Sequence, residues 1–176
     1  KLFLIDNSAE PKLSKMKLLD SRIEYVFNNS NIGFGAAHNI AIKKTIQDNI
    51  LYHLVLNPDV YFDENVLEEL YQYMQLNPDV GLVTPKILYP DSKIQYQCKL
   101  LPSPFDLFSR RFLNFGILKK YVEKKNNIFE LRFTNYSEIM EIPYLQGSFL
   151  FIRTDTLKKI GLFDDRFFMY LEDTDL

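Results

Sequence analysis

The feature that most constrains the fold is a regular alternation of strand-like and helix-like segments over the first half of the chain. Short apolar runs at Leu2–Ile5, Ile23–Phe27 and Leu51–Leu56 are typical of buried strands. Amphipathic stretches lie between or after them, one over residues 36–47 and one that begins at Asp63, which we predict to be its N-cap. Such alternation is typical of an α/β fold. We therefore predict a mostly parallel central sheet flanked by helices.

The pattern loosens between Lys86 and Met140, where prolines interrupt it. We predict one domain over residues 1–176, with 86–140 as an irregular insertion that includes an irregular helix within Phe105–Lys125. Regular structure returns as a strand at Phe149–Ile152, followed by a short helix that ends at Gly161.

Composition excludes several classes of protein. The formal net charge of −2 gives no basic footprint for nucleic acid. Cys98 is the single cysteine, so no internal disulfide can form, and a reducing compartment fits. No apolar run approaches the length of a membrane-spanning helix. The chain starts directly in an apolar strand and stops without a helix-ending signal, so we expect a piece of a longer cytoplasmic protein.

The pentapeptide LNPDV occurs twice, at Leu56–Val60 and at Leu76–Val80. The first copy follows a predicted strand, so Asn57 and Asp59 stand at the carboxyl edge of the sheet, where open α/β sheets bind ligands. Amide and carboxylate oxygens suit Mg²⁺ or Mn²⁺. The second copy follows a helix, and we predict that it is only a turn.

The glycine-rich stretch from Asn31 to Asn39 does not have the spacing of a dinucleotide-binding loop. Five residues separate Phe27 from Gly33, and His38 occupies the place of the third glycine. A nicotinamide oxidoreductase is therefore disfavoured. The stretch is either a flexible loop before a helix or a loop whose glycines allow a nucleotide to approach closely.

Acidic residues gather near the end of the chain, in the sequence FDDRFFMYLEDTDL. Glu172 and Asp173 follow an aromatic run, a setting in which acids either stabilise a helix N-terminus or supply a general base. Upstream, Gly147 before Ser148 would permit close approach of a substrate.

Taken in order, these pieces resemble the inverting glycosyltransferases of family 2, particularly their bacterial rhamnosyltransferase-like branch. The matching segments are Ile5-Asp6-Asn7-Ser8, Asn31 through Asn39, Asn57-Pro58-Asp59, Gly147 through Arg153, and Gly161 through Leu176. The resemblance implies a GT-A fold, which is a Rossmann-like nucleotide-sugar domain. It also implies that the family's first strand and helix precede Lys1 and that further contacts follow Leu176.

The resemblance also implies roles for individual residues. Asp173 would be the catalytic base, Asp59 would hold a divalent metal (Mn²⁺ or Mg²⁺), and Gly147, Ser148 and Glu172 would lie on the acceptor or donor side. The nucleotide would be bound by Asp6, Asn7, Asn31, Gly33, Asn39 and Asn57.

The implied reaction moves a sugar from a dTDP- or UDP-sugar to a glycan or a lipid-linked acceptor in surface polysaccharide synthesis. The segment 86–140 would shape the acceptor side, and the parent protein would work in the cytoplasm, with peripheral association at the inner face of the cell membrane as an option. Asn57 stands where many relatives have an aspartate. The alternative is therefore a non-catalytic module of the same fold that binds sugar or nucleotide.

Overall fold

The computed structural model describes residues 1–101 and 118–168, and these divide into two compact units. The first unit comprises Lys1–Val83 and the chain from Ser148 onward, and the second comprises Thr84–Gly147. The predicted insertion at 86–140 falls within the second unit. None of the helices in the described residues combines the length and the apolar character that crossing a bilayer requires.

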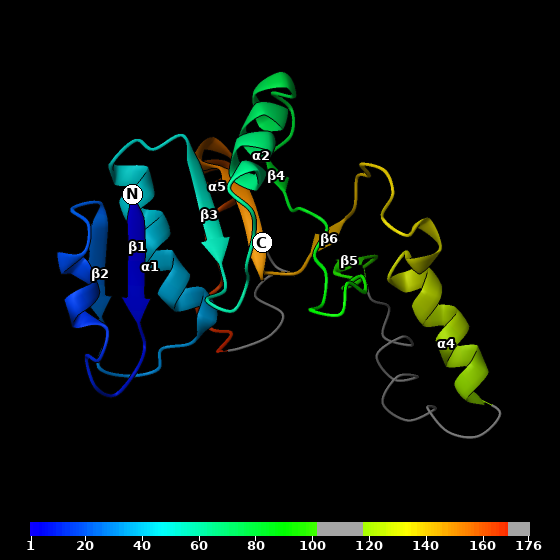
Figure 1. Ribbon diagram of the computed structural model, residues 1–176, viewed down its shortest axis with the longest axis horizontal. Helices are drawn as coiled ribbons and strands as arrows, with labels where there is room; N and C mark the ends of the chain where they lie inside the picture. Colours follow the sequence, from blue (N-terminus) through cyan, green and yellow to red (C-terminus); the bar gives the residue numbers. More distant parts are fainter. Residues whose placement is uncertain (102–117, 169–176) are drawn as a thin grey trace. The chain divides into compact units, whose positions relative to one another are not determined.

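The first unit contains two separate strand ladders (Figure 1). β1 (Leu2–Asp6) pairs in parallel with β2 (Ile23–Phe27), and the short 3-10 helix η1 (Ser14–Leu18) lies between them in sequence. In the other ladder, β7 (Phe149–Arg153) is the middle strand and runs antiparallel to both its neighbours. Those neighbours are β3 (Tyr52–Leu56) and β4 (Leu82–Val83).

The described part of the first unit also contains the helices α1 (Phe34–Gln47), α2 (Asn65–Leu76) and α5 (Thr154–Ile160). Helix α1 packs on both β1 and β3 and touches α5, so it bridges the two ladders. The α/β prediction is confirmed. β7 departs from the expected parallel direction, whereas β1 and β3 point the same way in Figure 1.

The core centres on β7, whose residues Phe149 to Ile152 are all buried. A run of four apolar residues without alternation is expected for a strand covered on both faces. The spacing of apolar residues along α1 predicts an inward face with Ala37, Ile40, Ala41 and Thr45, and the structure buries Ala41 and Thr45. Ile40 is only half-buried, whereas Ile42 is buried completely. The polar Asn39 also lies on the buried face.

The start and end of α2 differ in how well they could be predicted. Asp63 was expected to cap the helix with its side chain, but this is wrong: Glu64 is the N-cap, without a side-chain cap hydrogen bond, and Asp63 contributes only its backbone carbonyl to the Val66 amide. At the other end, the second LNPDV copy does end the helix. The side-chain amide of Asn77 donates to the backbone carbonyl of Tyr73 at 2.8 Å.

Both LNPDV copies form the same turn. The amide of Val60 donates to the Asn57 carbonyl at 3.2 Å, and that of Val80 to the Asn77 carbonyl at 3.1 Å. Their surroundings differ. Arg153 at the end of β7 donates to the carbonyl of Asn77 and so fastens the second copy to the sheet. The prediction that the second copy is structural agrees with these contacts.

The second unit contains short elements joined by irregular chain. β5 (Cys98–Lys99) pairs antiparallel with β6 (Tyr144–Leu145), and α4 (Leu118–Phe129) is followed by the 3-10 helix η2 (Arg132–Thr134). The predicted irregular helix over Phe105–Lys125 lies partly outside the described residues. Where the chain is described, α4 is regular and continues to Phe129.

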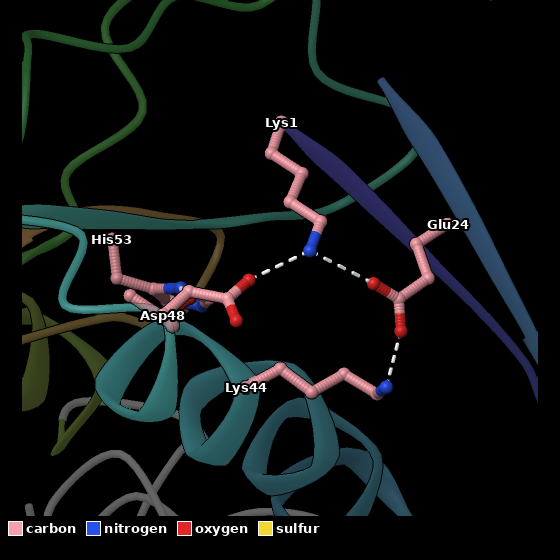
Figure 2. A network of polar contacts seen from close by, with 6 residues as sticks. Lys1, Glu24, Lys44, Asp48 and His53 are labelled. Atoms are coloured by element: carbon pink, nitrogen blue, oxygen red, sulfur yellow. Dashed lines mark hydrogen bonds and ion pairs between the residues drawn. The ribbon is translucent and has the colours of Figure 1, made fainter. Parts of the chain in front are cut away.

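A network of charged side chains joins α1 to the start of the β1–β2 ladder (Figure 2). The ammonium of Lys1 lies 2.6 Å from Asp48 and 3.0 Å from Glu24, and Glu24 also binds Lys44. Lys1 directly precedes β1, and Glu24 lies on β2. Lys44 lies in the last turn of α1, and Asp48 is the C-cap of that helix. The hydrogen bond from Lys44, and to a smaller extent the one from Lys1, hold the pKa of Glu24 below its ordinary value of 4.5.

This network predicts a pH-dependent contribution to stability. The folded-state pKa of Glu24 lies below the unfolded value, so its contribution is present above about pH 4.5 and is lost as the pH falls through the folded-state pKa. We expect Glu24→Gln to lower the free energy of unfolding at pH 7, and the difference from the wild type to shrink below pH 4.5. Urea denaturation at several pH values measures this.

The matched control is Glu69→Gln on the exposed face of α2, which should change stability little at any pH. An effect of Glu24→Gln that stayed constant down to pH 3 would contradict the ion-pair explanation. Because the side chains are partly exposed, added salt should also weaken the effect.

Candidate functional site

The carboxylate of Asp6 lies at the carboxyl end of β1 and is only 5% exposed. One oxygen accepts hydrogen bonds from the Ser8 amide at 3.0 Å and the Ser8 hydroxyl at 2.5 Å. The other oxygen accepts from the Tyr25 hydroxyl at 2.7 Å. The parallel register places Tyr25 on β2 opposite Leu4, two residues before Asp6, so the sheet itself brings the pair together.

These contacts fix the protonation states of the pair. The Ser8 hydroxyl, then the Tyr25 hydroxyl, hold the pKa of Asp6 below its ordinary value, although burial opposes them. Burial and then the hydrogen bond to Asp6 raise the pKa of Tyr25 to about 12. At neutral pH Asp6 is therefore an ionised acceptor and Tyr25 a protonated donor. A carboxylate oxygen has more than one acceptor site, so Asp6 retains acceptor capacity for a donor group on a ligand.

Asn7 connects the end of β1 to the loop that precedes α1. The side-chain oxygen of Asn7 accepts from the side-chain amide of Asn28 at 2.8 Å. The side-chain amide of Asn7 donates to the backbone carbonyl of Gly33 at 3.3 Å. The side-chain oxygen of Asn31 accepts from the Gly33 amide at 3.0 Å. These hydrogen bonds bring together three predicted nucleotide-binding residues, Asn7, Asn31 and Gly33. Asn7 directly follows Asp6 in the chain.

The backbone of Gly33 touches the C-terminal part of the first unit. Gly33 has φ +94°, and a Cβ added there would lie 2.6 Å from the carbonyl oxygen of Phe168. The amide of Phe34 donates to the same oxygen at 3.2 Å. The close approach that this glycine permits is therefore an approach by the protein's own chain, just before the acidic sequence motif.

Asn39 binds a second point on the same C-terminal segment. Its amide donates to the Phe163 carbonyl at 2.8 Å, and its oxygen accepts from the Phe163 amide at 3.1 Å. Both polar atoms of this buried side chain are thus used by backbone 124 positions away. We predicted nucleotide binding for Asn39, but in this structure its amide holds the loop around Phe163.

The first LNPDV copy lies at the end of β3, next to the start of β7. The backbone amide of Asn57 donates to the backbone carbonyl of Ser148 at 3.0 Å. Two predicted site residues are therefore neighbours across the β3–β7 ladder. Gly147 precedes Ser148 in the chain and is buried. Asn57 is half-buried, whereas Asp59 is exposed.

The predicted carboxylates of the tail, Glu172 and Asp173, lie outside the described residues. In the part of the chain that is described, no group of three or more His, Cys, Asp or Glu side chains is placed to hold a metal ion. Asp59 with Asn57 is the predicted metal pair, and its single carboxylate would depend on oxygens of a ligand to complete a coordination shell.

Three contributors to this arrangement were missed from the sequence: Tyr25, Phe163 and Phe168. Tyr25 is one of five half-buried residues of β2, and nothing in the sequence marks its hydroxyl as a partner of Asp6. The phenylalanines act through their backbone groups, which side-chain type does not reveal. The one signal in the sequence was Gly33, whose missing side chain permits a close approach.

Comparison with known proteins identifies the family to which this chain belongs. The profile of glycosyl transferase family 2 matches residues 4–161, which is most of the chain. The chain therefore belongs to glycosyl transferase family 2. The family implies the GT-A fold, and the α/β arrangement of the first unit agrees with it. No solved structure shows a significant match.

Two curated relatives are more specific. The chain is 25% identical over 171 residues to the low-salt glycan biosynthesis hexosyltransferase Agl10 of Haloferax volcanii, covering 97% of this chain and 50% of the relative. It is 26% identical over 160 residues to the N-acetylglucosaminyl-diphospho-decaprenol L-rhamnosyltransferase of Mycobacterium tuberculosis, covering 84% of this chain and 49% of the relative. The chain spans about half the length of these relatives.

The contact between Gly33 and Phe168 gives a prediction with a matched control. Gly33 and Gly161 have similar backbone angles, in a region that costs a residue with a side chain about 1–3 kcal/mol. A Cβ at Gly33 would also strike the Phe168 backbone, whereas one at Gly161 would meet nothing within 4 Å. We expect Gly33→Ala to lower the free energy of unfolding more than Gly161→Ala, as measured by urea denaturation.

The difference between the two variants isolates the contact from the backbone strain that both share. Equal losses of stability in Gly33→Ala and Gly161→Ala would show that the Phe168 segment does not rest against Gly33 in solution.

Proposed function

We propose that this chain is the nucleotide-sugar-binding part of an inverting glycosyltransferase. It uses a dTDP- or UDP-sugar and transfers the sugar to a glycan or lipid-linked acceptor. The observation that carries the proposal is the buried, ionised Asp6 at the carboxyl end of β1, beside the loop ordered by Asn7. An ionised acceptor at this edge suits an N–H group of a pyrimidine base or a ribose hydroxyl.

The loop between β2 and α1 would form the rest of the nucleotide site. Asn31 and Gly33 are ordered by hydrogen bonds to each other and to Asn7, so the loop is organised before a ligand binds. Asn39 supports this site indirectly, because it holds Phe163 close to the start of α1. Asn57 lies at the same edge of the unit, at the end of β3.

A divalent metal would be held by Asp59, with the diphosphate of the donor supplying further oxygens. The residues fit this role, since Mg²⁺ is usually bound through one or two carboxylates together with substrate phosphates. The exposed Asp59 is accessible for such a contact, and the amide oxygen of Asn57 is a hard donor two residues away. When bound, the metal would offset negative charge on the departing nucleotide diphosphate.

The transfer requires a base but no nucleophile from the enzyme. The acceptor hydroxyl oxygen forms a bond to the anomeric carbon while the bond from that carbon to the diphosphate oxygen breaks. The hydroxyl proton passes to the carboxylate of Asp173, and the bonding electrons leave with the nucleotide diphosphate. One displacement inverts the anomeric configuration. Glu172, Gly147 and Ser148 would border the reacting groups.

The two relatives suggest the setting of this reaction. One is named for glycan biosynthesis and the other for rhamnosyl transfer to a diphospho-decaprenol-linked sugar. By analogy, this chain would serve surface polysaccharide synthesis in the cytoplasm, and a lipid-linked acceptor would bring the parent protein to the inner face of the membrane. The unit Thr84–Gly147 would supply the acceptor side.

The duplicated pentapeptide provides a test of the metal assignment with a built-in control. UDP and dTDP, each with and without Mn²⁺, are added in a thermal-shift experiment, because ligand binding to the folded state raises Tm. A ligand at 100 times its Kd stabilises by about 2.7 kcal/mol, which corresponds to several degrees. We expect Asp59→Ala to abolish the Mn²⁺-dependent part of the shift, and Asp79→Ala in the second copy to retain it.

Equal shifts in Asp59→Ala and the wild type would exclude Asp59 as the metal ligand. A cooperatively melting protein that responds to no nucleotide diphosphate would contradict the proposed donor site. Nucleotide binding without any turnover in the full natural protein would support the non-catalytic module instead. NAD binding would revive the oxidoreductase interpretation.

The assignment of the base predicts a separation between binding and transfer. Asp173→Asn should keep the nucleotide-induced thermal shift and lose transfer by at least about 100-fold, the usual contribution of a positioned general base. Transfer is measured on the full natural protein with a radiolabelled donor. Asp175→Asn, two residues away, is the control that should remain active, and full activity of Asp173→Asn would make the assignment wrong.

A further inference from the structure

The unit Thr84–Gly147 carries an open groove of about 590 Å³ that the candidate site does not use. Its volume lies within the range of about 300–1,000 Å³ that is typical of small-molecule sites. Its lining is mainly aromatic and polar, with Ile94 as the single aliphatic residue, and the other members are Tyr89, Ser92, Lys93, Tyr96, Glu130 and Arg132.

One wall of the groove is a tight hairpin. Leu88 and Ile94 form an antiparallel bridge, and the amide of Tyr89 donates to the Lys93 carbonyl at 2.7 Å. The turn closes where the Ser92 amide donates to the Tyr89 carbonyl at 2.9 Å. This hairpin presents Tyr89 and Ser92, both exposed, towards the groove.

The other wall is the chain after α4, and Tyr136 fastens it in place. The Tyr136 hydroxyl donates to the Glu130 carbonyl at 2.9 Å and accepts from the Cys98 amide at 2.9 Å. The Tyr136 ring also meets the Tyr96 ring edge-on, with 5.4 Å between centroids. These contacts hold the two walls of the groove in place, so a ligand would find it already formed.

The charges in the groove are balanced within the protein. Arg132 pairs with Glu130 at 2.5 Å, and its guanidinium lies 5.2 Å above the centre of the Tyr96 ring. Lys93 pairs with Asp91 at 2.6 Å. Each cation therefore already has a carboxylate partner, which disfavours selection of a phosphate or another anion. Counting Asp91, which lies beside the groove rather than in its lining, the two cations are matched by two carboxylates.

Tyr89 supplies a flat apolar surface in this polar setting. Its side chain is 54% exposed, and its main chain is fixed by the hairpin. An exposed aromatic face beside paired charges and a serine hydroxyl matches a molecule with one apolar face of C–H groups and a rim of hydroxyls. A sugar ring has this character, and a diphosphate or an aliphatic chain does not.

We propose that this groove binds a neutral saccharide, the glycan part of the acceptor, with a sugar ring on Tyr89 and its hydroxyls bonded to Glu130, Arg132 and Ser92. The inference rests on the proposed glycosyl transfer and gives its acceptor a chemical class and a set of contacts. It assigns the aromatic hairpin of the second unit to substrate recognition.

Saturation-transfer NMR tests the proposal with methyl glycosides of glucose, N-acetylglucosamine, mannose and rhamnose. Inorganic pyrophosphate is the anionic probe, and its binding is followed by broadening of its ³¹P signal. We expect at least one glycoside to bind and pyrophosphate not to bind. Tyr89→Ala should weaken glycoside binding about five-fold, as expected for loss of an aromatic contact, whereas Tyr89→Phe keeps the ring and most of the binding. Phe133→Ala is the control, because this 69% exposed ring lies outside the groove.

Several results would overturn the proposal: no glycoside binds, Tyr89→Ala binds like the wild type, or pyrophosphate binds and Arg132→Ala abolishes that binding. Circular dichroism records the unfolding transition of each variant. If Tyr89→Ala does not fold, Tyr89→Phe is compared with the wild type instead, and Tyr89→Phe must then still bind the glycoside.

The same samples are titrated with UDP and dTDP in the presence of Mn²⁺. Nucleotide binding without glycoside binding overturns the groove assignment and leaves the proposed function intact. Glycoside binding at Tyr89 without nucleotide binding supports the groove and contradicts the donor site.

Discussion

The first unit depends on the pairing of β7 with strands on both its sides. This strand comes late in the sequence, yet it is the middle strand of its ladder and its residues from Phe149 to Ile152 are buried. The backbone of a buried strand must satisfy its hydrogen bonds with neighbours, so β3 and β4 are held in register by it. At its start, Ser148 meets Asn57, and at its end Arg153 binds the turn after α2. One strand therefore positions both copies of LNPDV.

The part of the fold that follows from local patterns was predictable. The strand at Ile23–Phe27 and the helix at Thr154–Ile160 occur as expected, because apolar runs and the glycine at 161 report directly on local structure. The inward face of α1 was harder, since Asn39 is a polar residue that the tertiary structure buries. A single sequence does not show that a distant backbone segment will satisfy its amide.

The candidate site shows the same division. The position of Asp6 at a strand end and of Asp59 after another strand follows from the α/β pattern. The hydrogen bond from Tyr25 to Asp6 depends on strand register, and the contact between Gly33 and Phe168 depends on chain path. Neither is encoded in residue type, and a positive φ does not reveal such a contact either, since Gly161 shares it with Gly33 and has no neighbour within 4 Å.

The two links between the loop before α1 and the C-terminal segment have a thermodynamic consequence. Phe163 is bound by Asn39, and the carbonyl of Phe168 lies against Gly33 and the Phe34 amide. A ligand that stabilises the ordered loop before α1 must also stabilise the packing of the C-terminal segment by the same free energy. A ligand that stabilises the packed segment stabilises the loop equally. Loosening of the C-terminal segment and loosening of the loop before α1 would then be one event rather than two independent ones.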